Sequence, residues 1–397
     1  MLPIKTEIQA QAQELFPEVL GHRRHLHMHP ELSFKEEQTA AYVASQLQEM
    51  GIPYQKGIGG HGIVAHIEGE QGKGKLLALR ADMDALPIQE ENEVPYASTQ
   101  PGIMHACGHD VHTASLLGVA KILVSQQSKF AGTFRLLFQP AEERLPGGAS
   151  LMIRDGALQS PQVESILGQH VLPYIDAGKV GIRPGVYMAS ADEIYLTIKG
   201  KGGHAASPQL CVDPVTIGAQ IIASLQQVIS RADPREPSVL SFGRFIAEGA
   251  TNVIPDEVHI AGTFRAMNET WRKEAHTKIR SIVEGTATAF GAEADLDIRV
   301  GYPVLKNNET LTNRIRKYMS AYVGEENIVD LGLWLGAEDF AYYTHEVPGC
   351  FYRLGTRNKA KGITHGLHTP KFNIDESTLE LSIGLMSWLA LNELGVG

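Results

Sequence analysis

Residues 104–112 read Met-His-Ala-Cys-Gly-His-Asp-Val-His, and they bring three histidines, a cysteine and an aspartate into one short stretch. Imidazole, thiolate and carboxylate groups are the side chains that bind first-row transition metals. Cys107 and His109 are two residues apart, so an extended backbone would point both side chains to one side. From Val111 onward the apolar residues indicate a helix that is buried on most of its surface. The cluster is therefore predicted to lie in a turn that leads into a helix, from which polar side chains reach a crevice.

Three buried strands are predicted near this turn, and each delivers polar groups at its end. The strands and their polar groups are 76–79 with Asp82 and Asp84, 133–139 with Glu142 and Glu143, and 165–170 with His170. In α/β proteins the active groups gather beyond the carboxyl ends of the strands. We therefore expect all of these side chains to lie close to the 104–112 turn.

Helices and strands with ordinary patterns complete this first region. Helices are predicted at 5–20, 38–50, 312–322 and 376–394, and a strand is predicted at 351–354. Two apolar runs, 62–68 and 75–80, are joined by the Gly-rich sequence 70–74 and predict a β-hairpin.

The middle of the chain has a different pattern. Alternating strands and long helices follow one another there in the order β-α-β-β-α-β. This order fits a small inserted domain with an open antiparallel sheet. We predict an α/β catalytic domain at 1–186 and 302–397, with a mixed central sheet flanked by helices, and an inserted α+β, ferredoxin-like domain at 187–301.

Composition and charge exclude several classes of protein. The 397 residues are 43% hydrophobic and 20% charged, as in an ordinary soluble globular protein, and the net charge of −10 argues against a nucleic-acid partner. Cys107, Cys211 and Cys350 are too few and odd in number for a disulfide framework, which favours a reducing compartment. The polar N-terminus predicts no signal peptide, and no apolar run predicts a membrane span. We expect a cytoplasmic enzyme.

The densest histidine run, His22-Arg-Arg-His-Leu-His-Met-His29, competes with the 104–112 turn as a metal site. His25 and His29 would share one face of a helix. However, Pro30 ends such a helix, and Arg23 and Arg24 place positive charge beside any bound cation. We therefore expect this run not to bind metal.

The donor set around the turn favours particular metals. Carboxylates such as Glu143 occur together with the softer His109, His170 and Cys107, a mixture that suits zinc, manganese, cobalt or nickel better than magnesium or calcium. A thiolate can bridge two cations roughly 3.5–4 Å apart, and such a pair polarises a carbonyl and lowers the pKa of water. Adjacent Glu142 and Glu143 would divide the work between a general base and a metal ligand.

Four further residues carry weaker signals. His368 lies in the turn Gly366-Leu-His-Thr-Pro370, and His204 follows a glycine-rich loop in the inserted region. Asn252 and Arg265 add an amide and a guanidinium, and arginine binds carboxylates bidentately. Each of these residues taken alone is typical of ordinary turn chemistry.

Taken together, the motifs resemble the dinuclear-metal aminoacylase and amidohydrolase family, a branch of the carboxypeptidase G-like metallopeptidases. Its members include hippurate hydrolases, N-acyl-L-amino acid amidohydrolases and plant indole-acetyl amino acid hydrolases. The resemblance covers nearly the whole chain. It rests on HRRHLHMHPELSFKE, RADMDALP, MHACGHDVHT, FQPAEE, GQHV, GKGGHAASP, NVIPDEV, GTFR, GAEDFAYY and HTPKFN.

The resemblance implies roles for the residues in these motifs. It implies two divalent ions per subunit, a lid that forms a homodimer, Glu142 as general base and acid, and His204 as the group that stabilises the oxyanion. Asn252 and Arg265 would hold the substrate carboxylate. The implied metal ligands are Cys107 (bridging), His109, Glu143, His170 and His368.

One motif departs from the related peptidases. A His-x-Asp pair occupies the place of Asp82-Met83-Asp84 in those enzymes, and an aspartate bridges the metals. Here Cys107 would bridge and Asp82 replaces the histidine ligand. Asp82 is therefore left open as a ligand, and Asp84 is interpreted as a residue that supports the ligands.

The function predicted from the sequence is metal-dependent cleavage of the amide bond of small N-acyl-L-amino acids to a carboxylate and an amino acid. A dipeptidase or carboxypeptidase on the same scaffold is the nearest alternative. A binding relative without catalytic activity is the alternative from another class. The acyl group, the amino acid and the native metal stay open.

Overall fold

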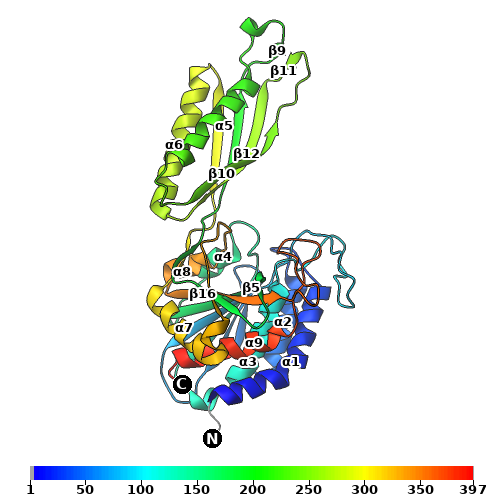
Figure 1. Cartoon of the computed structure of the whole chain (residues 1–397), viewed down its shortest axis with the longest axis vertical. Coiled ribbons are helices and arrows are strands. Elements are labelled where there is room, and N and C mark those ends of the chain that lie inside the picture. The colour runs from blue at the N-terminus through cyan, green and yellow to red at the C-terminus, as the bar shows by residue number, and fades with distance from the viewer. Residues whose placement is uncertain (1–3, 397) are drawn as a thin grey trace. The chain divides into compact units, whose positions relative to one another are not determined.

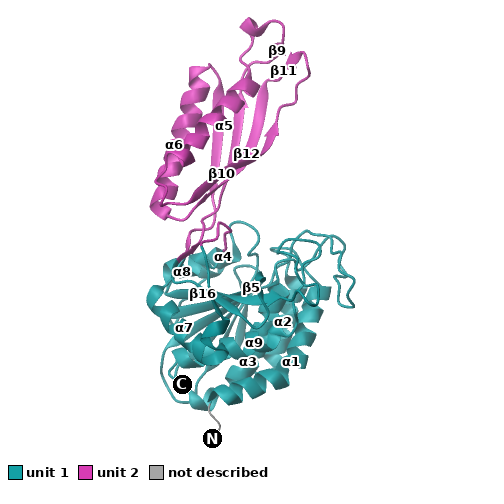
Figure 2. Ribbon diagram, viewed as in Figure 1, with its two compact units in different colours: residues 1–185, 306–332, 339–397 teal, residues 186–305, 333–338 magenta. Residues whose placement is uncertain are grey.

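A computed structural model describes residues 4–396 of the chain, which divide into two compact units (Figures 1 and 2). Unit 1 comprises Met1–Gly185, Lys306–Gly332 and Asp339–Gly397, and unit 2 comprises Val186–Leu305 and Leu333–Glu338. Each unit has a hydrophobic core of its own.

Unit 1 is built on an eight-stranded mixed sheet in the order β1-β2-β4-β3-β5-β16-β6-β15. The central strands β4, β3, β5 and β16 are parallel, whereas β1, β2 and β6 pair with their neighbours in antiparallel fashion on at least one side. The predicted mixed α/β fold is thus confirmed. The strands are β1 Tyr54–Ile58, β2 Gly62–Glu68, β3 Leu76–Asp82, β4 Thr133–Gln139, β5 Ser165–Asp176, β6 Val180–Ile182, β15 Ile328–Asp330 and β16 Gly349–Arg357.

Helices flank this sheet (Figure 1). Helix α3 packs between α1 and α9, and nearly all of its residues are buried, as its apolar pattern predicts. Helix α1 is longer than predicted, because it continues through the histidine run and ends at Met28, two residues before Pro30. The helices are α1 Ile4–Met28, α2 Glu37–Glu49, α3 His109–Ser125, α4 Gly148–Arg154, α7 Glu309–Val323, α8 Ala341–Glu346 and α9 Thr378–Glu393, with short 3-10 helices at Gln127–Lys129 and Glu325–Asn327.

The predicted hairpin between β2 and β3 is wrong. Strand β4 lies between them, antiparallel to β2 and parallel to β3. The Gly-rich link after β2 instead bonds to the residues that lead into β4, through Gly69 N–H to Gly132 O and Gly132 N–H to Gly72 O, both 2.9 Å. The link is therefore a surface connection, and α3 provides the crossover from β3 to β4.

Unit 2 contains a four-stranded antiparallel sheet in the order β10-β12-β8-β13, against which α5 and α6 pack. The elements follow the predicted β-α-β-β-α-β order, and the sheet order is that of a ferredoxin-like fold. They are β8 Asp192–Lys199, α5 Pro214–Ser230, β10 Ser238–Ile246, β12 Glu257–Ala266, α6 Glu269–Ala289 and β13 Glu293–Val300. A small ladder joins β9 Gly203–His204 to β11 Val253–Ile254, and Pro208–Leu210 form a 3-10 helix.

The chain passes between the two units within β7 Gly185–Met188 and β14 Leu305–Asn307, and again on either side of Leu333–Glu338. Over the part of the chain that is described, no helix combines the length and the apolar character needed to cross a membrane.

Candidate metal centre

The turn 104–108 is held against β5 by a close backbone approach. Gly108 precedes α3 with φ of 85°, and a Cβ at this position would lie 2.4 Å from Cγ2 of Val171. Only glycine combines that left-handed conformation with that closeness. The side chains of Cys107 and His109, on either side of Gly108, are consequently fixed beside the carboxyl ends of β3 and β4 and beside the middle of β5.

Five predicted ligands from four segments of the chain converge here. The Sγ atom of Cys107 lies 3.4 Å from Nε2 of both His170 and His368. The Oε1 atom of Glu143 lies 3.2 Å from Nε2 of His368 and 4.0 Å from Nε2 of His109. Donor atoms of Cys107, His109 and His170 form one group in which all three lie within 4.8 Å of one another, and Cys107, Glu143 and His368 form another.

Backbone carbonyl groups orient two of the predicted histidine ligands. Nδ1 of His109 lies 2.9 Å from the carbonyl oxygen of Asp84, and Nδ1 of His170 lies 2.7 Å from the carbonyl oxygen of Val171. Because a carbonyl only accepts, both Nδ1 atoms must donate, which leaves a lone pair on each Nε2. This is the tautomer that binds metals through Nε2.

Two donor atoms at this place lack a hydrogen-bond partner although they are buried. They are Nε2 of His109 and Oε1 of Glu143, whose approach to His368 does not have hydrogen-bond geometry. Buried polar atoms without a partner cost free energy, and a bound cation would give both of these atoms a partner. The residues present therefore fit a divalent cation.

The electrostatics of the cluster also favour a cation. Burial, together with the Glu143 and Glu142 carboxylates, raises the pKa of the Cys107 thiol well above its ordinary value. Although burial opposes it, the carboxylates of Asp82 and Asp84 raise the pKa of His109 to about 10. Nearby carboxylates contribute to both shifts, and burial adds to the shift of Cys107. A cation among these donors would favour the thiolate and would replace the proton on His109.

Asp82 lies beside the predicted ligands, with its Oδ2 atom 3.6 Å from Nε2 of His109, and it is also held by other buried side chains. Its buried carboxylate pairs with Arg80 and with Nδ1 of His112, and Nε2 of His112 in turn accepts the N–H of Val171 at 3.0 Å. Although burial opposes it, Arg80 and His109 hold the pKa of Asp82 well below its ordinary range. Asp82 thus anchors His112 beneath the cluster. Asp84 contacts Nδ1 of His109, which fits the supporting role predicted for it.

Glu142 lies beside the ligand cluster. Its side chain is nearly buried, and a carboxylate oxygen lies within 4.8 Å of donor atoms of His109 and Glu143. Its Oε1 atom accepts the N–H of Asp339 at 3.4 Å. Asp339 also binds Arg80 and Gln139, so that one buried polar network reaches the carboxylate. Sequence reasoning did not identify Arg80 or Asp339 as members of this network.

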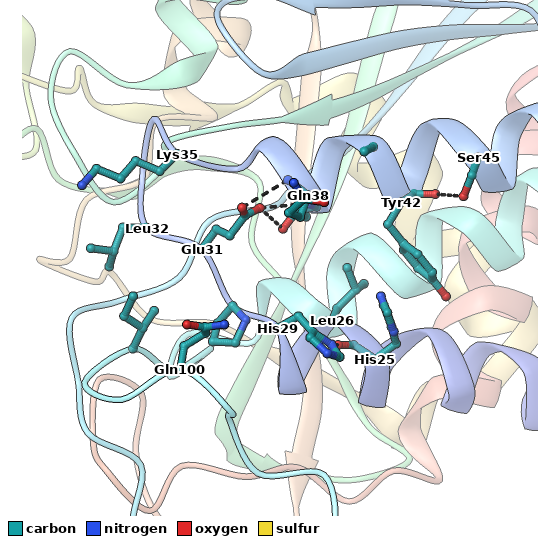
Figure 3. A pocket seen from close by; sticks show the side chains of 14 residues that line it. His25, Leu26, His29, Glu31, Leu32, Lys35, Gln38, Tyr42, Ser45 and Gln100 are labelled. Carbon is teal, nitrogen blue, oxygen red and sulfur yellow. Dashed lines mark hydrogen bonds between the residues drawn. The ribbon is translucent and has the colours of Figure 1, made fainter.

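The N-terminal histidine run touches the 104–112 turn through His27 and Asp110 but contributes no donor atom to the ligand cluster. His25 and His29 line a pocket of about 680 Å³ that is bounded by α1 and α2 (Figure 3). His27 is buried, and its ring nitrogens lie 2.8 Å from Oδ2 of Asp110 and 3.1 Å from Oε1 of Glu90. Within residues 4–396, none of the clusters of three or more donor side chains that could hold a metal includes a histidine of this run.

Alanine at His25 or His27 is expected to leave the metal content of the folded protein unchanged. His27→Ala should lower thermal stability, because Asp110 and Glu90 lose a buried partner. Metal per chain, measured by mass spectrometry on monodisperse protein, checks this expectation, with His109→Ala as the control that should lose metal. The loss of one equivalent from folded His25→Ala would place a ligand in the run.

The other three predicted residues belong to unit 2, and they lie at opposite ends of its sheet. His204 and Asn252 are neighbours, because β9 pairs with β11 and the Asn252 carbonyl accepts the N–H of Ala205 at 3.1 Å. They lie near the end where Lys199 pairs with Glu257. Arg265 is eight residues further along β12, which corresponds to about 26 Å at the rise of an extended strand.

The His204 side chain is exposed and oriented by its own loop. Its Nδ1 atom accepts the N–H of Ala206 at 3.1 Å. The neutral ring therefore carries its proton on Nε2, where it is available as a hydrogen-bond donor. Arg265 is partly buried, and its Nε donates to Oγ1 of Thr263 at 3.2 Å.

Comparisons with known proteins find relatives of this chain. The N-acyl-L-amino acid amidohydrolase of Geobacillus stearothermophilus is 45% identical over 307 residues, which is 77% of this chain and 82% of that protein. Thermostable carboxypeptidase 2 of Saccharolobus solfataricus is 36% identical over 97% of this chain and 98% of its own length. A crystal structure of the Bacillus subtilis YXEP protein, described as a dinuclear metal binding peptidase from the M20 family, matches with a TM-score of 0.83. It is 34% identical and covers 97% of this chain and 100% of that chain.

A family model also matches most of the chain. Residues 78–391 match the model described as peptidase family M20/M25/M40, a range that contains every residue of the candidate metal centre. The resemblance inferred from the motifs is thereby confirmed, and this chain belongs to the M20/M25/M40 family of peptidases.

Proposed function

We propose that this hydrolase is a metal-dependent amidase that converts N-acyl-L-amino acids to a carboxylate and a free amino acid. The observation that carries the proposal is the convergence of imidazole, thiolate and carboxylate donors beside Glu142. Two of these donor atoms, one on His109 and one on Glu143, are buried without a hydrogen-bond partner. The 45% identical amidohydrolase supports the substrate class.

Two divalent ions would be held by Cys107, His109, Glu143, His170 and His368, and the Cys107 thiolate would be the ligand common to both. Zinc, manganese, cobalt or nickel fits this mixture of donors. When bound, such ions polarise the substrate carbonyl and make a water molecule more acidic. Asp84 and the carbonyl of Val171 keep His109 and His170 in the tautomer required for binding.

Glu142 is the proposed general base and acid. It takes a proton from the water whose oxygen attacks the carbonyl carbon, and it delivers that proton to the amide nitrogen as the C–N bond breaks. The products are a carboxylic acid and an amine, so the atoms and protons balance. The N–H of Asp339 donates to Oε1 of Glu142 and so helps to hold this carboxylate in place.

His204, Asn252 and Arg265 are the proposed groups of unit 2 that contact substrate. The carbonyl and the carboxylate of an N-acyl amino acid are only about 5 Å apart. One sheet of unit 2 therefore cannot present both His204 and Arg265, which lie near opposite ends of it, to one substrate molecule. We infer a homodimer in which unit 2 of one chain supplies His204 and Asn252 to the site of its partner.

A carboxypeptidase or dipeptidase is the second candidate, because a carboxypeptidase matches over nearly the whole chain. Metal-analysed protein is incubated with N-acetyl amino acids, N-benzoyl amino acids and dipeptides, and the products are identified by mass spectrometry. Release of amino acid from the N-acyl compounds is expected. Turnover of dipeptides alone would favour the second candidate, and inactivity with every metal would indicate a binding relative.

Chelation is expected to abolish turnover, and added zinc, manganese, cobalt or nickel should restore it. Cys107→Ser should bind metal more weakly at both sites, since a neutral hydroxyl bridges cations poorly compared with a thiolate. Calorimetric titration of the apoprotein measures both affinities. Wild-type affinity at both sites in Cys107→Ser would contradict the bridging role.

A further inference from the structure

Glu36 is a buried carboxyl group with no role in the chemistry described above. It directly precedes α2, where an acidic side chain commonly caps the helix, yet it makes no capping hydrogen bond. Glu31 does that work, and its carboxylate accepts from the N–H groups of Gln38 and Thr39 (Figure 3). Glu36 is completely buried, and its Oε2 atom has no hydrogen-bond partner. Burial and the nearby Asp84 raise its pKa to about 7.

The Glu36 carboxylate instead binds two strained backbone positions. Its Oε1 atom accepts the N–H of Phe34 at 3.0 Å and the N–H of Ala141 at 2.8 Å. Phe34 and Ala141 have φ of 67° and 51°, the left-handed conformation that side chains with a Cβ disfavour. Such a conformation persists only where surrounding contacts determine it.

Ala141 directly precedes Glu142 and Glu143. All three backbone N–H groups of this turn donate to buried carboxylates. Ala141 donates to Glu36, and Glu142 and Glu143 each donate to Asp84 at 3.0 Å. Asp84 also accepts from Oγ of Ser33 at 2.7 Å, so the segment 33–36 supports the turn at two points. Adjacent residues can serve as base and as ligand only if the backbone before them is held in one conformation.

We propose that Glu36 is a positioning residue that fixes the left-handed peptide at Ala141 and thereby sets the directions of Glu142 and Glu143. The proposal rests on the roles proposed above for those two glutamates. It requires that the side chain at position 36 be long enough to reach the N–H of Ala141. The negative charge is secondary, since an amide oxygen also accepts these hydrogen bonds.

Two substitutions separate the effect of the length of the side chain at position 36 from the effect of its charge. Glu36→Gln keeps the length and an acceptor oxygen but loses the charge, whereas Glu36→Asp keeps the charge but is one methylene too short. We expect Glu36→Gln to retain kcat within about threefold of wild type and Glu36→Asp to lose roughly 10- to 100-fold in kcat with little change in KM. Glu36→Asp should also bind one metal equivalent more weakly, because Glu143 belongs to the same turn.

Glu31→Ala is the matched control, because it disturbs the same segment and the start of α2 without touching the turn. It should lower thermal stability while kcat and metal affinity stay near wild type. Wild-type kcat and metal affinity in Glu36→Asp, or the reverse order in which Gln is worse than Asp, would overturn the proposal. If wild type turns over no N-acyl amino acid, the proposed function fails, whereas metal affinity in the three variants still tests the positioning role.

Discussion

Glu142→Gln is expected to lower kcat by roughly 10²–10⁴-fold while both metal equivalents stay bound. Glutamine keeps the size of the side chain and an oxygen that can accept the N–H of Asp339, so the turn should keep its structure. What is lost is the basic lone pair that takes the proton of the attacking water. Steady-state kinetics and metal analysis of the same preparation measure the two quantities together.

Glu143→Gln is the matched variant for this prediction. Its carboxylate lies 3.2 Å from Nε2 of His368 and within the Cys107 group, so its neutral amide should bind metal poorly. The two adjacent substitutions are thus expected to have opposite signatures, with loss of kcat at Glu142 and loss of metal at Glu143. The reverse result would mean that the base and the ligand had been assigned the wrong way round.

The convergence of the metal centre could be predicted because its signal is local. Each of the strands β3, β4 and β5 reads as an apolar run followed by polar residues, and parallel strands of α/β proteins align those residues at one edge. The turn at Cys107 and His109 could be recognised as a possible metal site because several donor side chains lie close together in its sequence. These features required no knowledge of which strand neighbours which.

The hairpin failed because the order of strands in a sheet is not a local property. The runs at 62–68 and 75–80 are close in sequence and joined by glycines, which favours a hairpin. The strand at 133–139 nevertheless lies between them. The glycine-rich link is compatible with both arrangements, because a surface connection and a hairpin turn require the same backbone freedom.

The contacts that support the site had no signal of their own. Glu36 stands in Lys35-Glu36-Glu37, which reads as a solvated helix start, yet its side chain is completely buried. His112 counted as one more possible ligand, whereas both of its nitrogens are used by Asp82 and Val171. Such roles depend on which backbone N–H groups lack partners, and only the tertiary structure determines this.

The arrangement within unit 2 could likewise not be read from the motifs. His204, Asn252 and Arg265 were expected to act on one substrate, and the register of β8 and β12 places Arg265 at the other end of the sheet from the first two. Strand register determines this separation. The separation therefore supports a site to which a second chain contributes His204.

His204→Ala is expected to bind metal normally and to lose roughly 10²–10³-fold in kcat. The Nε2–H group of His204 is exposed and is oriented by the N–H of Ala206, so it is prepared to donate to an oxygen that becomes negative in the transition state. None of the proposed metal ligands lies in unit 2, and metal content should therefore not change. Loss of metal from folded His204→Ala would contradict this role.

Complementation between two inactive chains tests whether His204 acts in the partner's site. His204→Ala and Glu142→Ala are mixed under conditions that exchange subunits, with exchange verified by native mass spectrometry. A heterodimer then has one site with both substitutions and one with neither. An equal mixture should recover about a quarter of wild-type activity, because half of the dimers each contain one intact site of two.

The structure offers a sharp control for this experiment. His204 and Asn252 lie together near one end of the unit 2 sheet, so both would reach the same partner site. His204→Ala mixed with Asn252→Ala should therefore not recover activity, because the unit 2 that reaches each site lacks either His204 or Asn252. Glu142→Ala mixed with Asn252→Ala should recover activity. If verified exchange leaves the His204→Ala and Glu142→Ala mixture at the parental level, His204 does not act across the dimer. Recovery in the His204→Ala and Asn252→Ala mixture would show instead that these two neighbours serve different sites.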